Sequence, residues 1–126
     1  MVNLGWILRE EHDRDEAEVK FKAGVRASRL QGDVAGLAYS ALGLACLASD
    51  LAAWQRAARL FGVADALLES IGHRWQHPES KYRDTSIDSV VQEIGTASFE
   101  AEHLAGERLS LEAAIEYCLT PAPQPS

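Results

Sequence analysis

Two histidines, His73 and His77, have the spacing that most resembles a metal site. They stand four residues apart in the segment GHRWQHPE, and on a helix this spacing places two imidazoles on one face, as zinc ligands require. A third ligand could come from Glu79 or His103. The glycine and the proline in the segment indicate a loop instead, so we predict no metal ligand. A metal-binding protein or small helical enzyme stays open as an alternative that requires His73, His77 and His103 to converge.

Other reactive residue types occur without the arrangement that catalysis requires. The run REEHDRDE at 9–16 contains carboxylates, but acid-base chemistry needs burial to shift a pKa, and this run is typical of an exposed turn. Serine, histidine and aspartate are present without a nucleophile elbow. Cys46 and Cys118 lie far apart among apolar neighbours, which is typical of buried thiols rather than of a disulfide or a nucleophile. We therefore predict a protein that is not an enzyme and has no cofactor.

Composition and charge narrow the classes of partner. A chain of 126 residues, 47% hydrophobic and 25% charged, is typical of one globular domain. Nineteen acidic residues against twelve basic ones give a formal charge of -7, which argues against direct contact with nucleic acid. The amino terminus lacks the basic region of a signal peptide, and no long apolar run predicts a membrane span. Together with two cysteines expected to be reduced, these features predict a cytoplasmic protein.

Hydrophobic periodicity predicts helices throughout and no strand. Apolar residues recur at steps of three and four, and the segment VAGLAYSALGLACLA is apolar almost all round, so it is expected to be the most buried helix. Seven helices are expected, over about 2–9, 17–31, 34–48, 49–72, 79–94, 97–105 and 111–119.

Residues with capping propensity set the expected ends of these helices. Gly32 is expected to end the second helix and Asp33 to cap the third, while Ser49 and Asp50 are expected to open the fourth. Gly72 is expected to end the fourth helix, and Pro78 suits the first turn of the fifth. Gly95 is expected to close that fifth helix. The remaining expected caps are Thr96 and Ser110 at amino-terminal ends, with Gly106 as the stop of the sixth helix.

The first two helix pairs superimpose as an internal repeat. Leu4 and Gly5 correspond to Leu42 and Gly43. The tetratricopeptide pattern places a small residue twelve positions after the glycine and an aromatic residue sixteen after it, where Ala17 and Phe21 stand. Gly24 takes the next small position, three residues after Phe21, and the second unit repeats the trio Ala17, Phe21 and Gly24, after two extra turn residues, as Ala57, Phe61 and Ala64. Small residues let the paired helices approach and the aromatic ring fills the neighbouring hole, so we interpret these residues as core contacts.

A more specific resemblance covers about two thirds of the chain. The segments ALGLACLA, QRAARLFGVADALLESIG and IGTASFEAEHLAGERLSLEAAIEYCL resemble the C-terminal tetratricopeptide-like helical-repeat region of LuxR-type, ATPase-containing actinobacterial transcriptional regulators. The shared positions include Gly43, Gly62, Gly72, Pro78, Gly95, Phe99, Gly106 and Ser110. The resemblance implies an all-α, right-handed stack of antiparallel helix pairs, with about seven helices over residues 1–119.

The resemblance also implies a function outside catalysis. Such regulators carry an ATPase module before the repeats and often a helix-turn-helix after an Ala/Pro linker, and TPAPQPS at 120–126 is expected to be such a linker or a disordered tail. These 126 residues contain neither a nucleotide-binding loop nor a basic recognition helix. The chain is then expected to be a scaffold that relays a signal or ligand binding to a DNA-binding domain outside it. The alternative is a stand-alone peptide- or protein-binding adaptor.

A groove is the expected interaction surface, because the first helices of tetratricopeptide pairs line a concave face that holds a peptide or a partner helix. Partners are expected to be a protein, a peptide or other domains of the parent regulator, and apolar surface at the amino-terminal end favours a homodimer of the isolated chain. The predicted groove residues are Asn3, Trp6, Arg9, Glu10, Ser40, Leu44 and Leu47.

Overall fold

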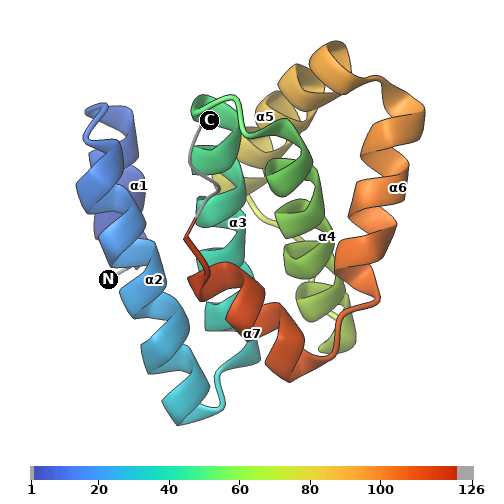
Figure 1. Ribbon diagram of the computed structural model, residues 1–126. Coiled ribbons are helices and arrows are strands. Elements are labelled where there is room, and N and C mark those ends of the chain that lie inside the picture. The colour runs from blue at the N-terminus through green and yellow to red at the C-terminus, as the bar shows by residue number, and fades with distance from the viewer. Residues whose placement is uncertain (1, 122–126) are drawn as a thin grey trace.

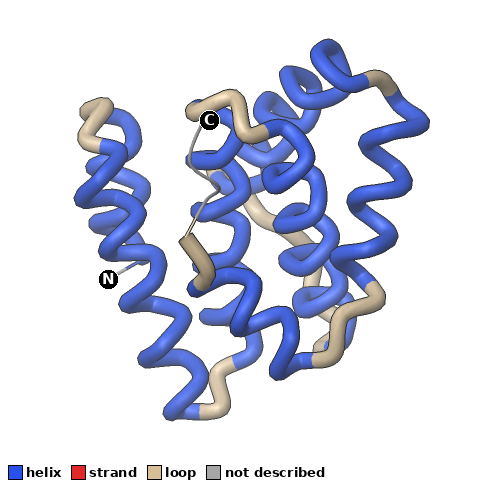
Figure 2. The backbone as a smooth tube through the Cα atoms, in the orientation of Figure 1, coloured by secondary structure: helices blue, strands red, loops and turns tan. Residues whose placement is uncertain are grey.

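The computed structural model describes residues 2–121 and is helical throughout, with no strand in that range (Figures 1 and 2). The expected all-α class with seven helices is confirmed for these residues. Five residues of the predicted linker, 122–126, lie outside the described part of the chain. The helices are α1 (Val2–Glu10), α2 (Arg14–Gln31), α3 (Val34–Asp50), α4 (Trp54–Ser70), α5 (Glu79–Ile94), α6 (Thr96–Glu107) and α7 (Leu111–Leu119).

Helix α3 lies at the centre of the molecule. The pair α1 and α2 packs on one side of it, α4 packs on the other side, and α5 runs behind them in the view of Figure 1. Helix α6 packs along the far side of α4, while α7 returns across the front and contacts both α2 and α4. The last helix therefore connects the amino-terminal pair, through α2, to the later helices, through α4.

The burial of α3 follows from its composition. Between Leu37 and Ser49 all residues except Tyr39 are buried, as expected for a helix that is apolar on every side and covered by several neighbours. The other helices bury one face only. The prediction that this segment is the most buried helix is confirmed, and so is the burial of both cysteines.

The aromatic ring of Phe21 is wedged between two glycines from different helices. A β-carbon built on Gly43 of α3 would overlap this ring, and one built on Gly5 of α1 would lie 2.9 Å from it. Phe21 has no exposed surface. The absence of side chains at Gly5 and Gly43 therefore makes the space that the ring fills, as close helix packing requires. Ala57, Phe61 and Ala64 are likewise fully buried, which confirms their prediction as core contacts.

Helices α4 and α6 also meet at a pair of glycines. A β-carbon on Gly62 would overlap the backbone carbonyl of His103, and one on Gly106 would overlap the carbonyl of Arg59. Backbone therefore touches backbone in both directions at this crossing. Because a main chain cannot move aside as a flexible side chain can, neither position accepts a larger residue without separating the two helices.

Several predicted helix ends are confirmed. Gly32 ends α2 in the left-handed conformation, at φ 66°, and the Asp33 carboxylate accepts the Gly36 N–H at 2.9 Å to cap α3. Ser110 caps α7 by accepting the Ala113 N–H at 3.2 Å. The fifth helix spans Glu79–Ile94, as expected from Pro78 before it and Gly95 after it.

The expected start of α4 at Ser49 and Asp50 is wrong, because both residues belong to the last turn of α3. Their side chains make tertiary contacts instead of caps. The Ser49 hydroxyl donates to the Ser86 carbonyl at 3.5 Å, and the Asp50 carboxylate binds Arg9. Helix α4 begins at Trp54 after a turn in which Ala52 has a positive φ of 59°, and no side chain caps it.

Two predicted boundaries of α6 are also wrong. Thr96 is the first residue of the helix rather than its cap, since Gly95 occupies the capping position with φ 85°. Gly106 lies inside the helix rather than after it, and the helix ends at Glu107. The reason for the glycine is the contact with α4 described above, not helix termination. No helix within residues 2–121 is both long enough and apolar enough to cross a membrane.

Candidate functional site

The densest polar cluster in the described residues surrounds Asp65, a carboxylate on the inner face of α4 with 8% of its surface exposed. Its Oδ1 accepts hydrogen bonds from Trp75 Nε1 at 2.7 Å and from Arg83 Nε at 2.9 Å. Its Oδ2 lies 2.7 Å from both Arg83 Nη2 and His103 Nε2. Three partners from separate segments therefore surround one buried carboxylate.

Each segment brings its side chain to Asp65 for a local reason. Helix α4 ends at Ser70, and the chain turns at Gly72, which has φ 71°, so that the following loop folds back along α4 and delivers Trp75. Arg83 lies in the first half of α5, and His103 lies on α6 next to the glycine crossing. The cluster thus joins α4, the loop after it, α5 and α6.

The charges in this cluster stabilise one another. Burial by itself raises the pKa of Asp65, but the hydrogen bonds from His103 and Arg83 and the Arg83 charge outweigh it and lower the pKa to about 2. The hydrogen bond to Asp65 raises the pKa of His103 against the opposing effect of burial, and the charges of Asp65 and Glu107 raise it further. The geometry therefore favours an anionic Asp65 beside a protonated His103.

The arrangement leaves little capacity for acid-base chemistry. The second ring nitrogen of His103, Nδ1, lies 2.7 Å from a carboxylate oxygen of Glu107, so each nitrogen faces a carboxylate. A general base needs a free nitrogen or oxygen directed at a substrate. The two Asp65 oxygens already make four short polar contacts, and neither nitrogen of His103 is free. The cluster is therefore suited to hold helices in register.

A cavity of about 190 Å³ adjoins the cluster, with Asp65, Leu68, Glu69, His73, Arg74, Trp75 and Arg83 in its wall. The two charged side chains at its inner wall, Asp65 and Arg83, are already paired with each other. The rings of Trp75 and Tyr39 pack edge to face, with centroids 5.0 Å apart. This cavity is a shallow recess beside a satisfied ion pair.

The histidines that suggested a metal site lie in different environments. His73 and His77 are exposed in the loop between α4 and α5, whereas His103 is bound between two carboxylates on α6. Among residues 2–121 no three histidine, cysteine, aspartate or glutamate side chains are grouped as metal ligands. Both cysteines are buried, and burial raises the pKa of Cys46 to about 11 and that of Cys118 to about 12, which keeps both thiols protonated.

The predicted groove residues are divided between the core and the surface. Trp6, Ser40, Leu44 and Leu47 are buried, so a partner cannot reach these four side chains in this arrangement. Tyr82 of α5 covers Trp6, with ring centroids 5.1 Å apart. The Trp6 Nε1 and Ser40 Oγ atoms have no hydrogen-bond partner in the described part of the chain.

The remaining groove residues are polar, and Arg9 and Glu10 lie at the rim of this contact between α1 and α5. Asn3 is exposed. Arg9 makes a two-pronged ion pair with Asp50, at 2.8 and 3.0 Å, and the Glu10 carboxylate accepts the Tyr82 hydroxyl at 2.8 Å. Helix α5 therefore occupies the side of α1 and α3 on which the groove was expected.

A second recess, mainly apolar and about 310 Å³ in volume, opens where α3 begins and α4 and α6 end. Its walls are Val34, Val63, Ala66, Leu67, Ser70, Gly106, Glu107, Leu109, Leu111 and Ala114. Neither this recess nor the Asp65 cluster was predicted from the sequence. A signal for the cluster was present, since Asp65 stands between Phe61 and Leu68 on the apolar face of its helix, where a single charge requires a buried partner.

Comparison with known proteins adds no relative: no protein family, curated protein or solved structure matches this chain.

Proposed function

We propose that this chain is a non-catalytic, protein-interaction and scaffold region of a cytoplasmic bacterial transcriptional regulator. In this proposal it has the right-handed, tetratricopeptide-like stack of antiparallel helix pairs found in LuxR-type, ATPase-containing regulators. It relays a signal or ligand binding to a DNA-binding domain outside the chain through contacts with that domain or with other proteins.

The observation that carries the proposal is the position of the glycines on which the sequence resemblance rests. Gly43 meets the Phe21 ring, and Gly62 and Gly106 meet the backbone of the opposite helix. Each of these positions is a point of closest helix approach, where a side chain does not fit. The resemblance therefore involves residues that determine how the helices stack, which is the property that related scaffolds share.

The Asp65 cluster supports a relay rather than a reaction. Its ion pairs and hydrogen bonds connect four consecutive segments, so that displacement of α6 or of the loop after α4 is transmitted to the rest of the unit. Helices coupled in this way move together as a body, and movement of packed helices is one of the ordinary means of signal transfer.

The stand-alone adaptor remains the second candidate because of the apolar recess beside α4 and α7. Its leucine and valine walls suit one or two apolar side chains of a bound peptide. In that case the partner binds this chain directly, and no DNA-binding domain is covalently attached.

The test uses the complete open reading frame that contains these 126 codons. We expect it to encode a DNA-binding region, and we expect removal of codons 2–119 to abolish regulated transcription in the host while gel-shift affinity for the bound promoter is retained. A full-length His103→Gln variant should weaken regulation, and His73→Gln, in the exposed loop, serves as its control. A reading frame without any DNA-binding region overturns the regulator proposal and leaves the adaptor.

A further inference from the structure

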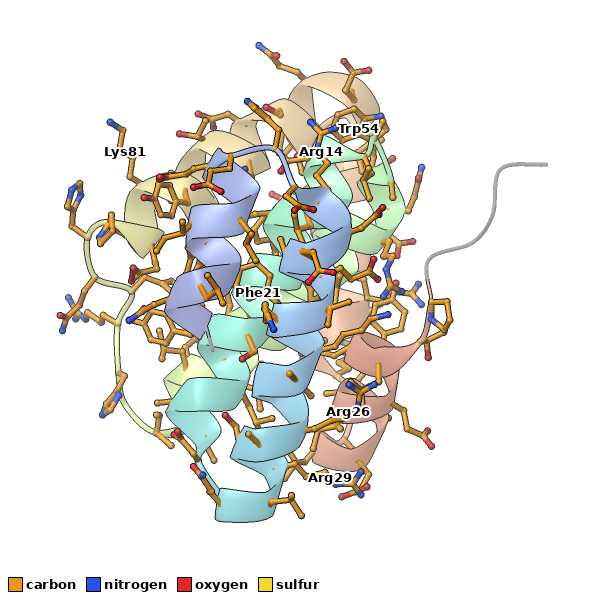
Figure 3. All side chains as sticks on the ribbon, turned by 90° about the vertical axis from the view of Figure 1, so that its left-hand side faces the viewer. Arg14, Phe21, Arg26, Arg29, Trp54 and Lys81 are labelled. Atoms are coloured by element: carbon orange, nitrogen blue, oxygen red, sulfur yellow. The ribbon has the colours of Figure 1, made fainter. Side chains whose placement is uncertain are left out.

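The outer face of α2 carries a regular stripe of residues that are exposed to solvent, apart from Ala23, which is partly buried. Figure 3 turns α1 and α2 toward the viewer, with Arg26 labelled on α2. The buried residues of α2 face α1 and α3, and the opposite side exposes 54% of Val19 and 88% of Leu30. The stripe consists of Glu16, Val19, Ala23, Arg26 and Leu30, at alternating steps of three and four residues.

This spacing is the a/d pattern by which two helices pack along a seam. A seam that presents Val19 to water is unfavourable, since it exposes apolar surface that burial would stabilise. The stripe also carries opposite charges toward its two ends. Glu16 and Arg26 are exposed, and neither side chain forms an ion pair within residues 2–121.

We propose that this stripe pairs with the same stripe of a second copy of the chain, antiparallel about a two-fold axis. A two-fold contact is reciprocal: if residue X of one copy meets residue Y of the other, then residue Y of the first copy also meets residue X of the other. Placing Val19 against Ala23 of the second copy then places Glu16 against Arg26 of the second copy. The symmetric dimer gains two apolar contacts at its centre and one ion pair on each side of them.

The position of α1 fits the same axis. The residue midway between Glu16 and Arg26 is Phe21, and the axis therefore passes at its level. Phe21 packs against Gly5 of α1, so Leu4, one residue before Gly5, and Ile7, two residues after it, lie at the same level along α2 as the axis. They expose 44% and 51% of their surface. Figure 3 shows α1 beside α2 on this side of the molecule, so these two apolar side chains lie next to the proposed seam.

The small size of the contact indicates a weak dimer. Eighteen residues of α2 span about 27 Å and nine of α1 about 13 Å, so two helices roughly 10 Å wide give a footprint of about 400 Å² per copy. The total of about 800 Å² is below the roughly 1,200 Å² at which specific, stable interfaces begin, and is typical of weak, transient contacts. We therefore expect a reversible dimer with a dissociation constant of roughly 10 to 100 µM. This inference does not depend on the proposed function.

Charge reversal provides the test, by sedimentation equilibrium of the whole chain from about 5 to 500 µM. Glu16→Arg or Arg26→Glu alone turns two attractive pairs into two repulsive ones, and each should weaken dimerisation at least tenfold. The double variant E16R/R26E restores opposite charges and should return to within about threefold of the wild type. Matched controls are Asp88→Arg and Arg108→Glu, at exposed positions on other elements, with folding of every variant checked by circular dichroism.

Three outcomes would overturn the proposal. The first is a wild-type chain that stays monomeric over the whole concentration range. The second is a dimer that none of the reversals weakens, which would place the contact on another face. The third is a double variant that stays as weak as the singles, which would show that Glu16 and Arg26 do not face each other across the axis. None of these results bears on whether the reading frame encodes a DNA-binding region.

Discussion

The first three helices and the following three are joined by different kinds of contact. Around Phe21, α1, α2 and α3 are fitted by shape, since an aromatic ring occupies the space left by Gly5 and Gly43. Around Asp65, α4, α5 and α6 are joined by charges and hydrogen bonds, supplemented by the glycine crossing of α4 and α6. Shape complementarity does not depend on protonation, whereas a buried charge cluster does. The two regions should therefore respond differently to substitution and to pH.

The largest effect is expected from Asp65→Ala. Removal of the carboxylate leaves the Arg83 guanidinium, the Trp75 N–H and the protonated His103 partly buried without their acceptor, at a cost of about 4 kcal/mol of unfolding free energy. Urea denaturation measures the loss. Asp65→Asn, which keeps the shape and one acceptor, should lose less, and Asp88→Ala on the exposed side of α5 should change stability by less than about 0.5 kcal/mol. An Asp65→Ala variant as stable as the wild type would show that the cluster does not hold these helices.

A somewhat smaller effect is expected from Gly43→Leu in the region fitted by shape. Even a β-carbon overlaps the Phe21 ring, so the leucine must separate α2 from α3, at a cost of about 3 kcal/mol. Thermal unfolding measures it, with Ala101→Leu on the exposed surface of α6 as a control. A melting temperature equal to that of the wild type would refute both this packing and the repeat alignment of Gly5 with Gly43.

The smallest effect is a pH dependence that belongs to one region only. Because the pKa of His103 is raised in the folded state, its contribution is complete below the unfolded value of about 6.5 and is lost as pH rises through the folded value. The stability difference between wild type and His103→Gln should therefore be larger at pH 5.5 than at pH 8.5, as measured by urea denaturation. The deficit of Gly43→Leu should be the same at both values. If the stability losses of His103→Gln and Gly43→Leu changed equally with pH, the two regions would not differ in the kind of contact that joins their helices.

Protonation of Asp65 should reduce the folding stability at acid pH. Its pKa of about 2 lies below the ordinary value of about 3.8, so its contribution is present above pH 4 and is lost as pH falls toward 2. The region around Asp65 should therefore be most stable between about pH 4 and 6.5.

The contacts fitted by shape could be predicted from the sequence, because they depend on the spacing of small and aromatic residues along single helices. Gly5, Ala17, Phe21 and Gly43 follow such a pattern, and Gly32, Asp33 and Ser110 follow local capping rules. The contacts made by charge could not be predicted in the same way, because Asp65, Arg83 and His103 are brought together only by the tertiary arrangement. The groove residues illustrate the same limit, since the burial of Trp6 depends on where α5 packs.

The helix boundaries that were wrong have a common cause, except at Thr96, where Gly95 takes the capping position. Ser49, Asp50 and Gly106 are residue types that often end helices, but here each side chain, or its absence, serves a contact with another helix. Local propensity and tertiary contact compete for the same residue, and at these positions the tertiary contact prevails.

The ring of Phe21 and the two glycines beside it constrain how this protein can vary in evolution. A methyl group gained at position 43 or 5 requires volume to be lost at position 21, for example by replacement of the phenylalanine with leucine or valine. The three positions should therefore change in concert among homologues, with their summed side-chain volume kept constant although they lie on three different helices.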